Sequence, residues 1–167
     1  MRHRHAKIES GPLTKGALNN FAKHYCACLF ERIRKNRIDD TSPNDGRHGY
    51  NIPKEVVACT SKAPPFFVCR ARNNKTLQNP HPTLKAAYPP LRANGKPVDQ
   101  TLPGVRNYYP VGHCAEPHAA HILLNNMEEK RHPIAIADIR FSLAYNVKNQ
   151  SVVPYCGTCK MTFPQLR

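Results

Sequence analysis

The stretch Gly112–Ala120, which reads GHCAEPHAA, has to be considered together with the later stretch Cys156–Cys159, which reads CGTC. The first stretch places a thiol, Cys114, two residues before a carboxylate, Glu116, so one helical turn can bring both beside the same ion. The second stretch holds two thiols at chelating C-x-x-C spacing. Three sulfur ligands leave the fourth position of a tetrahedral Zn²⁺ for water, as in a catalytic site. We therefore predict a zinc site in which Glu116 moves protons and the ligands are Cys114, Cys156 and Cys159.

Two other interpretations of these cysteines stay open. His118 lies four residues after Cys114, on the same side of a helix, and as a fourth ligand it would close the zinc site for a purely structural role. In that case Glu116 would have no task, and the wide separation of the cysteines in sequence is unlike a compact zinc knuckle. A redox C-x-x-C without metal is the other alternative, but the βαβ context that it requires is missing.

The pair of motifs resembles the signature of the zinc-dependent cytidine deaminase-like superfamily, which is [HC]-x-E followed by P-C-x-x-C. Cys114-Ala115-Glu116 matches the first half and the CGTC stretch the second, with one departure, because Tyr155 separates Pro154 from Cys156. Within the superfamily, Cys-Ala-Glu-Pro followed by small and apolar residues is most similar to the YwqJ-like deaminases at the C-termini of bacterial polymorphic toxins. The resemblance covers about residues 56–167 and implies an α/β fold, a three-layer α/β/α sandwich, here truncated after its third helix.

The resemblance also implies an activity, in which Glu116 acts as acid and base while zinc-activated water replaces the amino group of a nucleobase. The expected reaction is cytosine to uracil in single-stranded DNA or RNA, although the sequence does not distinguish cytosine from adenine or DNA from RNA. It further implies an effector that is secreted and acts in the cytoplasm of a target cell, and an acidic immunity protein as partner. The alternatives are a free-nucleoside deaminase, a zinc-stabilised nucleic-acid-binding module without catalysis, and a chain that stays in its own cytoplasm.

Composition favours a polyanionic partner. In 167 residues, Lys and Arg outnumber Asp and Glu by 25 to 11, which gives a formal charge of +14 with nine histidines in addition. Such an excess favours nucleic acid over a merely solvated surface or an acidic protein. Seven cysteines, three of them assigned to zinc, indicate a reducing compartment and no disulfide framework. We expect no membrane span and no signal peptide, so that export would require carriage at the end of a larger polypeptide.

The first half of the chain predicts one helix and one hairpin. Residues 1–13 offer no apolar face and are expected to form a flexible basic arm, with residues 14–167 as a single domain. An amphipathic pattern predicts a helix over residues 14–34, and residues 36–53 form a loop. Two β-type runs, residues 55–60 and 65–71, predict an antiparallel hairpin.

Residues 73–112 form a long loop with seven prolines interleaved with Lys and Arg. Proline at this density precludes a long helix or a central strand. By the resemblance, this loop lines the substrate mouth, where aromatic side chains could stack a base; the alternative for the two tyrosines is packing against the zinc helices. The candidate substrate-binding residues are Tyr108, Tyr109, His113, His118 and Phe67.

The last third predicts a helix, a strand and a second helix. A buried stripe predicts a helix from about Cys114 to Lys130, and residues 134–141 read as a buried strand connected through that helix in βαβ fashion. Residues 143–153 extend that strand or form a loop. The final helix is expected from Cys156 to about Phe163. Because only three strands can be placed, another edge strand must come from about residues 143–147 or from the N-terminal region.

Overall fold

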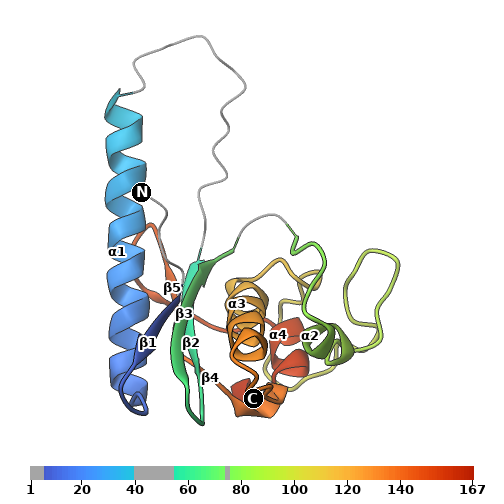
Figure 1. Ribbon diagram of the computed structural model, residues 1–167. Helices are drawn as coiled ribbons and strands as arrows, with labels where there is room; N and C mark the ends of the chain where they lie inside the picture. The colour runs from blue at the N-terminus through green and yellow to red at the C-terminus, as the bar shows by residue number, and fades with distance from the viewer. Residues whose placement is uncertain (1–5, 40–54, 74–75) are drawn as a thin grey trace.

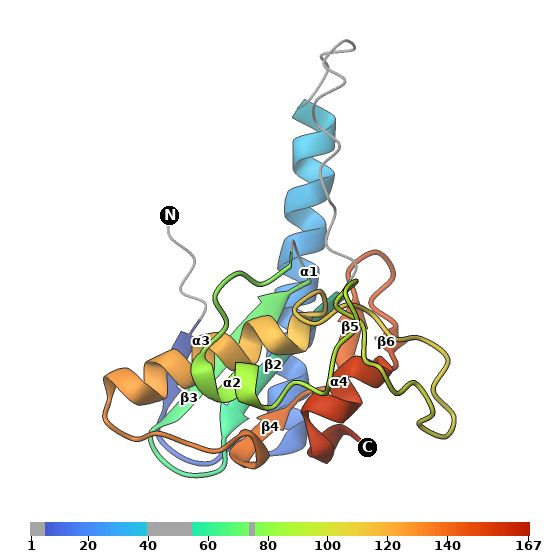
Figure 2. The same cartoon turned by 90° about the vertical axis from the view of Figure 1, so that its right-hand side faces the viewer.

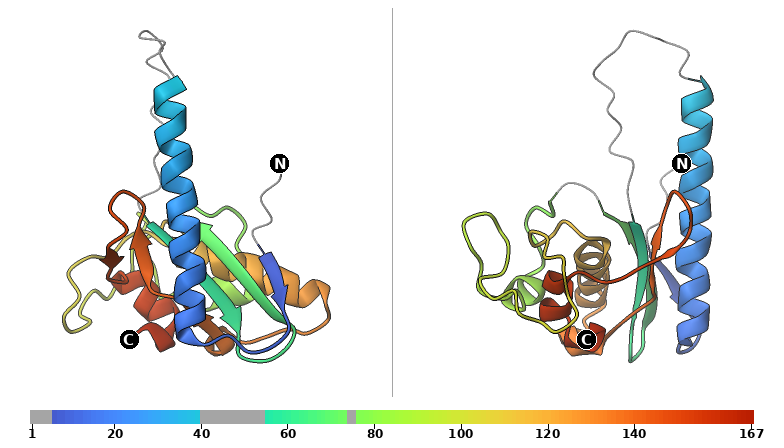
Figure 3. Two further views of the ribbon diagram at one scale, coloured as in Figure 1. Left: turned by 90° about the vertical axis from the view of Figure 1, so that its left-hand side faces the viewer. Right: turned by 180° about the vertical axis from the view of Figure 1, so that it is seen from behind.

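A six-stranded sheet separates two layers of helices in the computed structural model, which describes residues 6–39, 55–73 and 76–167. Helix α1 (Lys15–Asp39) covers one face of the sheet, and α2 (Pro82–Ala86), α3 (Ala115–Glu129) and α4 (Gly157–Thr162) lie on the other (Figure 1). Figure 2 looks onto the face with three helices, and the left view of Figure 3 onto α1. The α/β prediction is confirmed at the level of helix, sheet and helix layers. None of the helices described is long and apolar enough to cross a membrane.

All strand pairings in the sheet are antiparallel. The order is β1-β3-β2-β5-β6, with β4 also paired to β2, and the strands are β1 (Ala6–Glu9), β2 (Glu55–Ser61), β3 (Phe66–Arg72), β4 (Ile139–Phe141), β5 (Ala144–Asn146) and β6 (Val152–Val153). The predicted hairpin is confirmed as β2 and β3. Because β3 and β4 both run antiparallel to β2, they are parallel to each other across it, with α3 in the connection. The predicted βαβ crossover is therefore present, but β2 lies between its two strands.

Strand β2 is buried on both faces and links the two cores. Val56 and Ala58 belong to the apolar cluster under α1, whereas Val57 and Cys59 belong to the cluster under α3 and α4. This alternation follows from the two-residue period of a strand, and the almost continuous apolar run EVVACTS is typical of a strand covered on both sides.

The strand predicted over residues 134–141 is shorter than expected. Residues Ile136–Asp138 form a 3₁₀ turn, in which the carboxylate of Asp138 accepts a hydrogen bond from the backbone of Ala135, so only Ile139–Phe141 pair with β2. At Ser142 the pairing is interrupted: its N–H donates to the Ala58 carbonyl at 2.8 Å and its hydroxyl accepts from the Ala58 N–H at 2.9 Å. Pairing resumes in β5, which confirms that residues after Leu143 extend the strand.

The flexible-arm prediction is wrong for the part of residues 1–13 that the structure describes. Ala6–Glu9 pair with the outer edge of β3, with Ala6 opposite Cys69 and Glu9 opposite Phe66. An edge strand is held by backbone hydrogen bonds and needs no apolar face of its own, which is why its composition did not reveal it. Residues 1–5 and most of the loop predicted over residues 36–53 lie outside the described residues, and α1 extends to Asp39 instead of ending near residue 34.

The proline-rich segment is a loop with one short helix, as its composition predicts. Its single helical turn, α2, starts at a proline, and the His81 side chain accepts a hydrogen bond from the Thr83 N–H at 3.2 Å. An isolated bridge between Leu91 and Pro97 folds the following part back on itself. A second link joins this loop to the last helix, because the Asn107 carbonyl accepts from the Gly157 N–H at 2.8 Å.

Candidate metal centre

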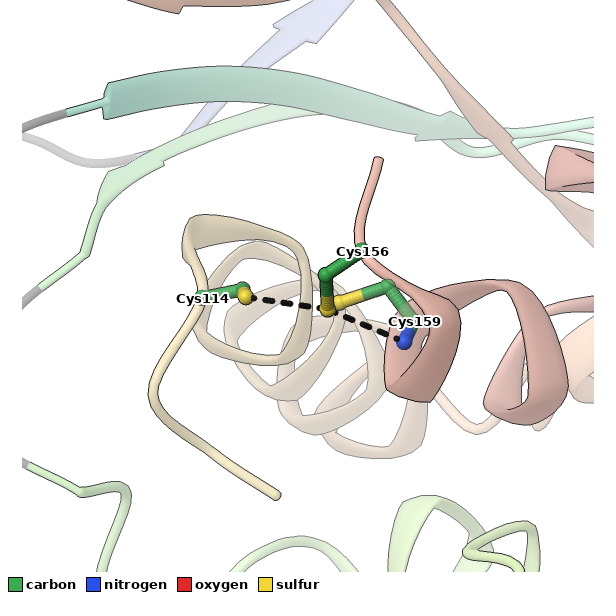
Figure 4. Close-up of side chains that lie close together, drawn as sticks. All are labelled: Cys114, Cys156 and Cys159. Atoms are coloured by element: carbon green, nitrogen blue, oxygen red, sulfur yellow. Dashed lines mark hydrogen bonds between the residues drawn. The ribbon is translucent and has the colours of Figure 1, made fainter. Parts of the chain in front are cut away.

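Two helix starts meet at the predicted zinc ligands. Cys114 is the N-cap of α3 and Cys156 the N-cap of α4, and both have an extended backbone just before the first helical residue. Cys159 lies in the first turn of α4. Figure 4 shows the three thiols turned toward one another from these two helices. Helix N-termini carry a positive partial charge, which stabilises thiolates.

The cysteine cluster, defined here as Cys114, Cys156 and Cys159, has the dimensions of a metal site. The sulfurs of Cys114 and Cys156 are 3.4 Å apart, and all three sulfur atoms lie within 4.8 Å of one another. Tetrahedral coordination at Zn–S distances of about 2.3 Å separates two sulfurs by about 3.8 Å. Small movements of these side chains would therefore hold a metal ion, and the cluster can bind one.

Hydrogen bonds among the three thiols lower the pKa of one of them and raise the pKa of the other two. Hydrogen bonds from the Cys114 and Cys159 thiols lower the pKa of Cys156 to about 3. Hydrogen bonding with Cys156 raises the pKa of Cys114, and hydrogen bonding with Cys114, followed by Cys156, raises the pKa of Cys159. Cys156 is therefore the thiol that loses its proton most readily, and thiols that are still protonated would release their protons on binding a metal.

Glu116 is buried next to the cluster, as the motif predicts. It lies in the first turn of α3, its side chain is 1% exposed, and its Oε2 is 3.5 Å from the Cys159 sulfur. Burial is the main cause that raises its pKa, and the neighbouring Glu55 carboxylate adds to it. A raised pKa makes a carboxyl group better able to hold a proton, as a general acid/base requires.

Glu55 is a second carboxylate at this site that the motifs did not reveal. Its Oε1 accepts a hydrogen bond from the Ala115 N–H at 3.3 Å, and an oxygen of Glu55 lies within 4.8 Å of ligand atoms of Cys114 and Glu116. Burial raises the pKa of Glu55 too. The signal in the sequence is a carboxylate directly before the buried run of β2, where an unpaired charge would be costly unless it met a partner.

His118 does not join the cysteine cluster. Its Nε2 lies 2.9 Å from the carbonyl oxygen of Gly112, and within the described part of the chain the group of potential ligands around the three sulfurs contains no histidine. The closed site with His118 as fourth ligand is therefore absent from this structure. His121, one turn further along α3, accepts a hydrogen bond from the His81 N–H at 3.1 Å, and burial lowers its pKa.

Two of the candidate substrate-binding residues are instead part of the core. Tyr108 is 7% exposed, its ring contacts Gly157, and its hydroxyl accepts a hydrogen bond from the Leu102 N–H at 2.8 Å. Phe67 is 4% exposed in the cluster between the sheet and α3. Both rings fill the layer beside the helices, which for Tyr108 is the packing alternative, and their contact with a substrate stays a prediction. Tyr109 and His113 are exposed beside the cluster and can contact a ligand.

Two further tyrosines lie near the cysteine cluster. Tyr155, the residue that departs from the signature, donates its hydroxyl hydrogen to the carbonyl of Ser142 at the interruption of the sheet. Burial, followed by the charge of Glu116, raises its pKa. Tyr88 of the proline-rich loop packs on the same core, and burial together with the Cys159 charge raises its pKa to about 12. Both half-buried tyrosines therefore lie near the buried site.

Comparison with known proteins adds no relative: no protein-family model, no curated protein and no solved structure matches this chain. The chemistry of the site thus has to be argued from its own residues.

Proposed function

We propose that the protein is a zinc-dependent deaminase that hydrolyses the amino group of a nucleobase, cytosine in the first instance, in single-stranded DNA or RNA. The observation that carries this proposal is the position of Glu116, buried 3.5 Å from a sulfur of a three-cysteine cluster. Glu116 lies outside the group of three sulfur ligands, so its carboxylate is left to move protons beside the ion. A three-thiolate site with an adjacent acid/base group is the constellation of the resembled superfamily.

The residues present fit zinc, since thiolates at these separations favour it over harder ions. A zinc ion bound here would supply the Lewis-acid activation of water that hydrolytic deamination requires. Glu116 would accept a proton from that water and deliver it to the ring nitrogen of the base. It would then take the second proton, from the oxygen newly bonded to the carbon, and pass it to the amino group as the C–N bond breaks, so that one C–O bond forms, one C–N bond is lost and ammonia leaves. Glu55 would hold the start of α3 through the Ala115 N–H and so keep Glu116 in place.

The order of elements also supports the resemblance. An antiparallel hairpin is followed by a helix that begins at Cys-Ala-Glu, then by a strand on β2, and finally by a helix that begins at C-x-x-C. In a deaminase sandwich these two helices lie on one face of the sheet, as α3 and α4 do here (Figure 2). We therefore propose the cytidine deaminase-like sandwich as the finer description of this three-layer fold.

Charge and exposure support a nucleic-acid substrate. The chain carries a formal +14, and Lys85, Arg92 and Arg106 of the proline-rich loop are exposed. Tyr109, 48% exposed beside the cluster, offers a ring for base stacking. By resemblance to toxin deaminases, the domain would act as a secreted effector in the cytoplasm of a target cell. Its producer would then need an acidic immunity protein that covers the basic surface.

The decisive experiment compares substrates with zinc-loaded protein. Cytosine-containing single strands, the same strands in duplex form and free cytidine are incubated with the protein at low and raised salt, and uracil is measured by mass spectrometry. We expect single strands to react fastest, because a duplex hides the reactive edge of the base, and raised salt to slow the reaction. Glu116→Gln should keep zinc and lose activity by about 10²–10⁴-fold or more.

Two results would redirect the proposal. A preference for free cytidine without salt dependence would identify a metabolic nucleoside deaminase. Stoichiometric zinc with four protein ligands, measured by X-ray absorption, and no uracil from any substrate would identify a non-catalytic binding module. The small exposure of the cluster, 7% for Cys114 and 2% for Cys159, is the observation that keeps this second candidate in the comparison.

A further inference from the structure

A basic pocket is lined by residues of α1, of β4 and of the end of the described chain. Figure 1 shows that the start of α1, strand β4 and the C-terminus lie at the same end of the molecule. Its volume is about 340 Å³, within the range of small-molecule sites. Four cationic side chains line it, and no acidic residue is among the lining residues. The cations are Lys15, Lys62, Arg140 and Arg167.

The cations of the basic pocket are not neutralised by acidic side chains. None of the four forms an ion pair with an acidic side chain of the described residues, although the Arg167 Nε–H donates to the Lys160 carbonyl at 3.2 Å. Lys15, Lys62 and Arg167 are exposed, whereas Arg140 on β4 is half-buried. Lys15 is also the first residue of α1, whose first turn contains no acidic residue, so the helix dipole adds positive potential at the same place. Four like charges beside a helix N-terminus repel one another, and an anion would relieve that repulsion.

Apolar side chains form the floor of the basic pocket. Leu18 from α1, Phe141 from β4 and Leu166 near the end of the chain line it between the cations. An apolar floor under a cationic rim fits a ligand with a flat apolar body and an anionic group, which describes a nucleotide unit. An aspartate or glutamate side chain has no apolar body to cover that floor, so an acidic polypeptide fits less well.

The basic pocket is distinct from the cysteine cluster but shares one residue with its surroundings. Tyr155 lines the pocket and directly precedes Cys156. We propose that the basic pocket binds one nucleotide of a single-stranded nucleic acid, with its phosphate among the Lys and Arg side chains and its base on the apolar floor. The inference rests on the proposed function only in taking that strand to be the substrate, because binding itself requires no reaction.

The test measures binding of a labelled oligothymidylate, which contains no cytosine, by fluorescence anisotropy over a range of salt. The variant Lys15→Gln/Lys62→Gln removes two pocket charges, and Lys130→Gln/Lys148→Gln, two exposed lysines outside the pocket, is the control with the same net charge. Each lost phosphate contact should reduce the salt slope by about 0.7. Because both lysines line the place of the one phosphate in the proposed nucleotide, loss of that contact should weaken binding about fivefold at 0.1 M salt, since 0.1 raised to the power 0.7 is about 1/5. The control should leave the slope unchanged.

Three outcomes would overturn the inference. Equal weakening by the pocket variant and the control would show diffuse charge attraction without a site. Equal affinity for an abasic strand of the same length would show that the apolar floor binds no base. Polyglutamate that binds as tightly per charge, and is equally weakened by the pocket variant, would identify an acidic polypeptide as the occupant.

The experiments distinguish a failure of this inference from a failure of the proposed function. If strands are deaminated but the pocket variant binds like wild type, only the pocket inference fails. If the pocket result holds but no base is deaminated, only the proposed function fails.

Discussion

Replacing Gly157 by alanine tests how closely the second helix start is fitted against the proline-rich loop. A Cβ at this position would overlap the ring of Tyr108, which is 7% exposed and therefore enclosed by its neighbours. The ring is also held by the hydrogen bond from Leu102 to its hydroxyl at 2.8 Å, and Gly157 itself by its bond to Asn107 at 2.8 Å. Neither side can retreat without losing one of these bonds.

The expected loss in free energy of unfolding for Gly157→Ala follows from three contributions. Overpacking typically costs about 1–3 kcal/mol. A displaced hydrogen bond adds about 0.5–1.5 kcal/mol, and the better helix propensity of alanine offsets about 0.5–1 kcal/mol. The net destabilisation is therefore about 0.5–4 kcal/mol. Gly157 lies between two residues of the cysteine cluster, so the overlap should also weaken zinc binding. The zinc affinity should fall about tenfold for each 1.4 kcal/mol of binding free energy that is lost.

Urea unfolding and competition with a chromophoric zinc chelator measure the two effects. Gly16→Ala is the matched control, because the nearest atom to its added Cβ, outside the chain neighbours and the helix backbone, is 3.9 Å away, and it should be neutral or stabilise by up to about 1 kcal/mol. Adding Tyr108→Ala removes the overlap, so the double variant should be less destabilised than the sum of the single variants by about 1–3 kcal/mol. Strict additivity of the two substitutions would refute the proposed packing.

Four further outcomes are expected. Cysteine-to-serine replacement of any member of the cysteine cluster should abolish stoichiometric zinc by metal analysis, and full retention in one variant would remove that residue from the ligand set. With zinc bound, a thiol reagent should modify Cys28, which is exposed, well before the six other thiols, all of which are buried; fast reaction of a second thiol would contradict the structure. Ser142→Ala should lower the free energy of unfolding by about 1–3 kcal/mol because it leaves the buried Ala58 N–H without its acceptor, whereas the exposed Ser151→Ala should change it by less than about 0.5 kcal/mol. Glu55→Ala, which removes the acceptor of the Ala115 N–H, should keep zinc but slow deamination, and an unchanged rate would remove its positioning role.

A pH dependence of stability follows from the buried thiol of Cys69. Burial raises its pKa to about 12, so the folded state keeps this thiol protonated where the unfolded chain has begun to ionise. Its contribution to stability is therefore complete below the unfolded pKa of about 8.5 and is lost as the pH rises toward 12. Chemical denaturation at pH 7 and pH 10 should show a decrease that Cys69→Ala reduces, and an equal decrease in that variant would assign the effect to other groups.

The site could be predicted from the sequence where chemistry depends on local spacing. Cys114 and Glu116 share one helical turn and the two later thiols another, so the motif alone located them, and the helices begin where chelating residues cap them. Glu55 was missed because its contact with Ala115 joins residues 60 positions apart, which no local pattern encodes. The burial of Phe67 and Tyr108 could not be predicted, because an aromatic residue near a site looks the same in sequence whether it lies in the core or on the surface.

The helices and strands could be predicted where burial of one or both faces imposes a regular spacing of apolar residues. The apolar run of β2 and the helical stripe of α3 gave their elements within a residue or two. Strand β1 has no such period, because its place is decided by the free edge of β3, and β4 is shortened by the local bond between Asp138 and Ala135. Pairing with a neighbouring strand and capping by side chains depend on the folded structure. They determine the bounds of the strands that the hydrophobic pattern could not predict.

The separation of Cys114 and Cys156 gives the cluster a topological role as well as a chemical one. Their sulfurs are 3.4 Å apart in space but 42 positions apart in the chain, and the intervening segment contains α3 and three strands of the sheet. A metal ion bound by both cysteines would cross-link the two ends of that segment. A cross-link over a loop of this length removes unfolded-state entropy worth roughly 4 kcal/mol. Binding of the ion would thus stabilise the C-terminal half of the protein against unfolding. The resistance of this half to proteases would therefore increase when the metal is available.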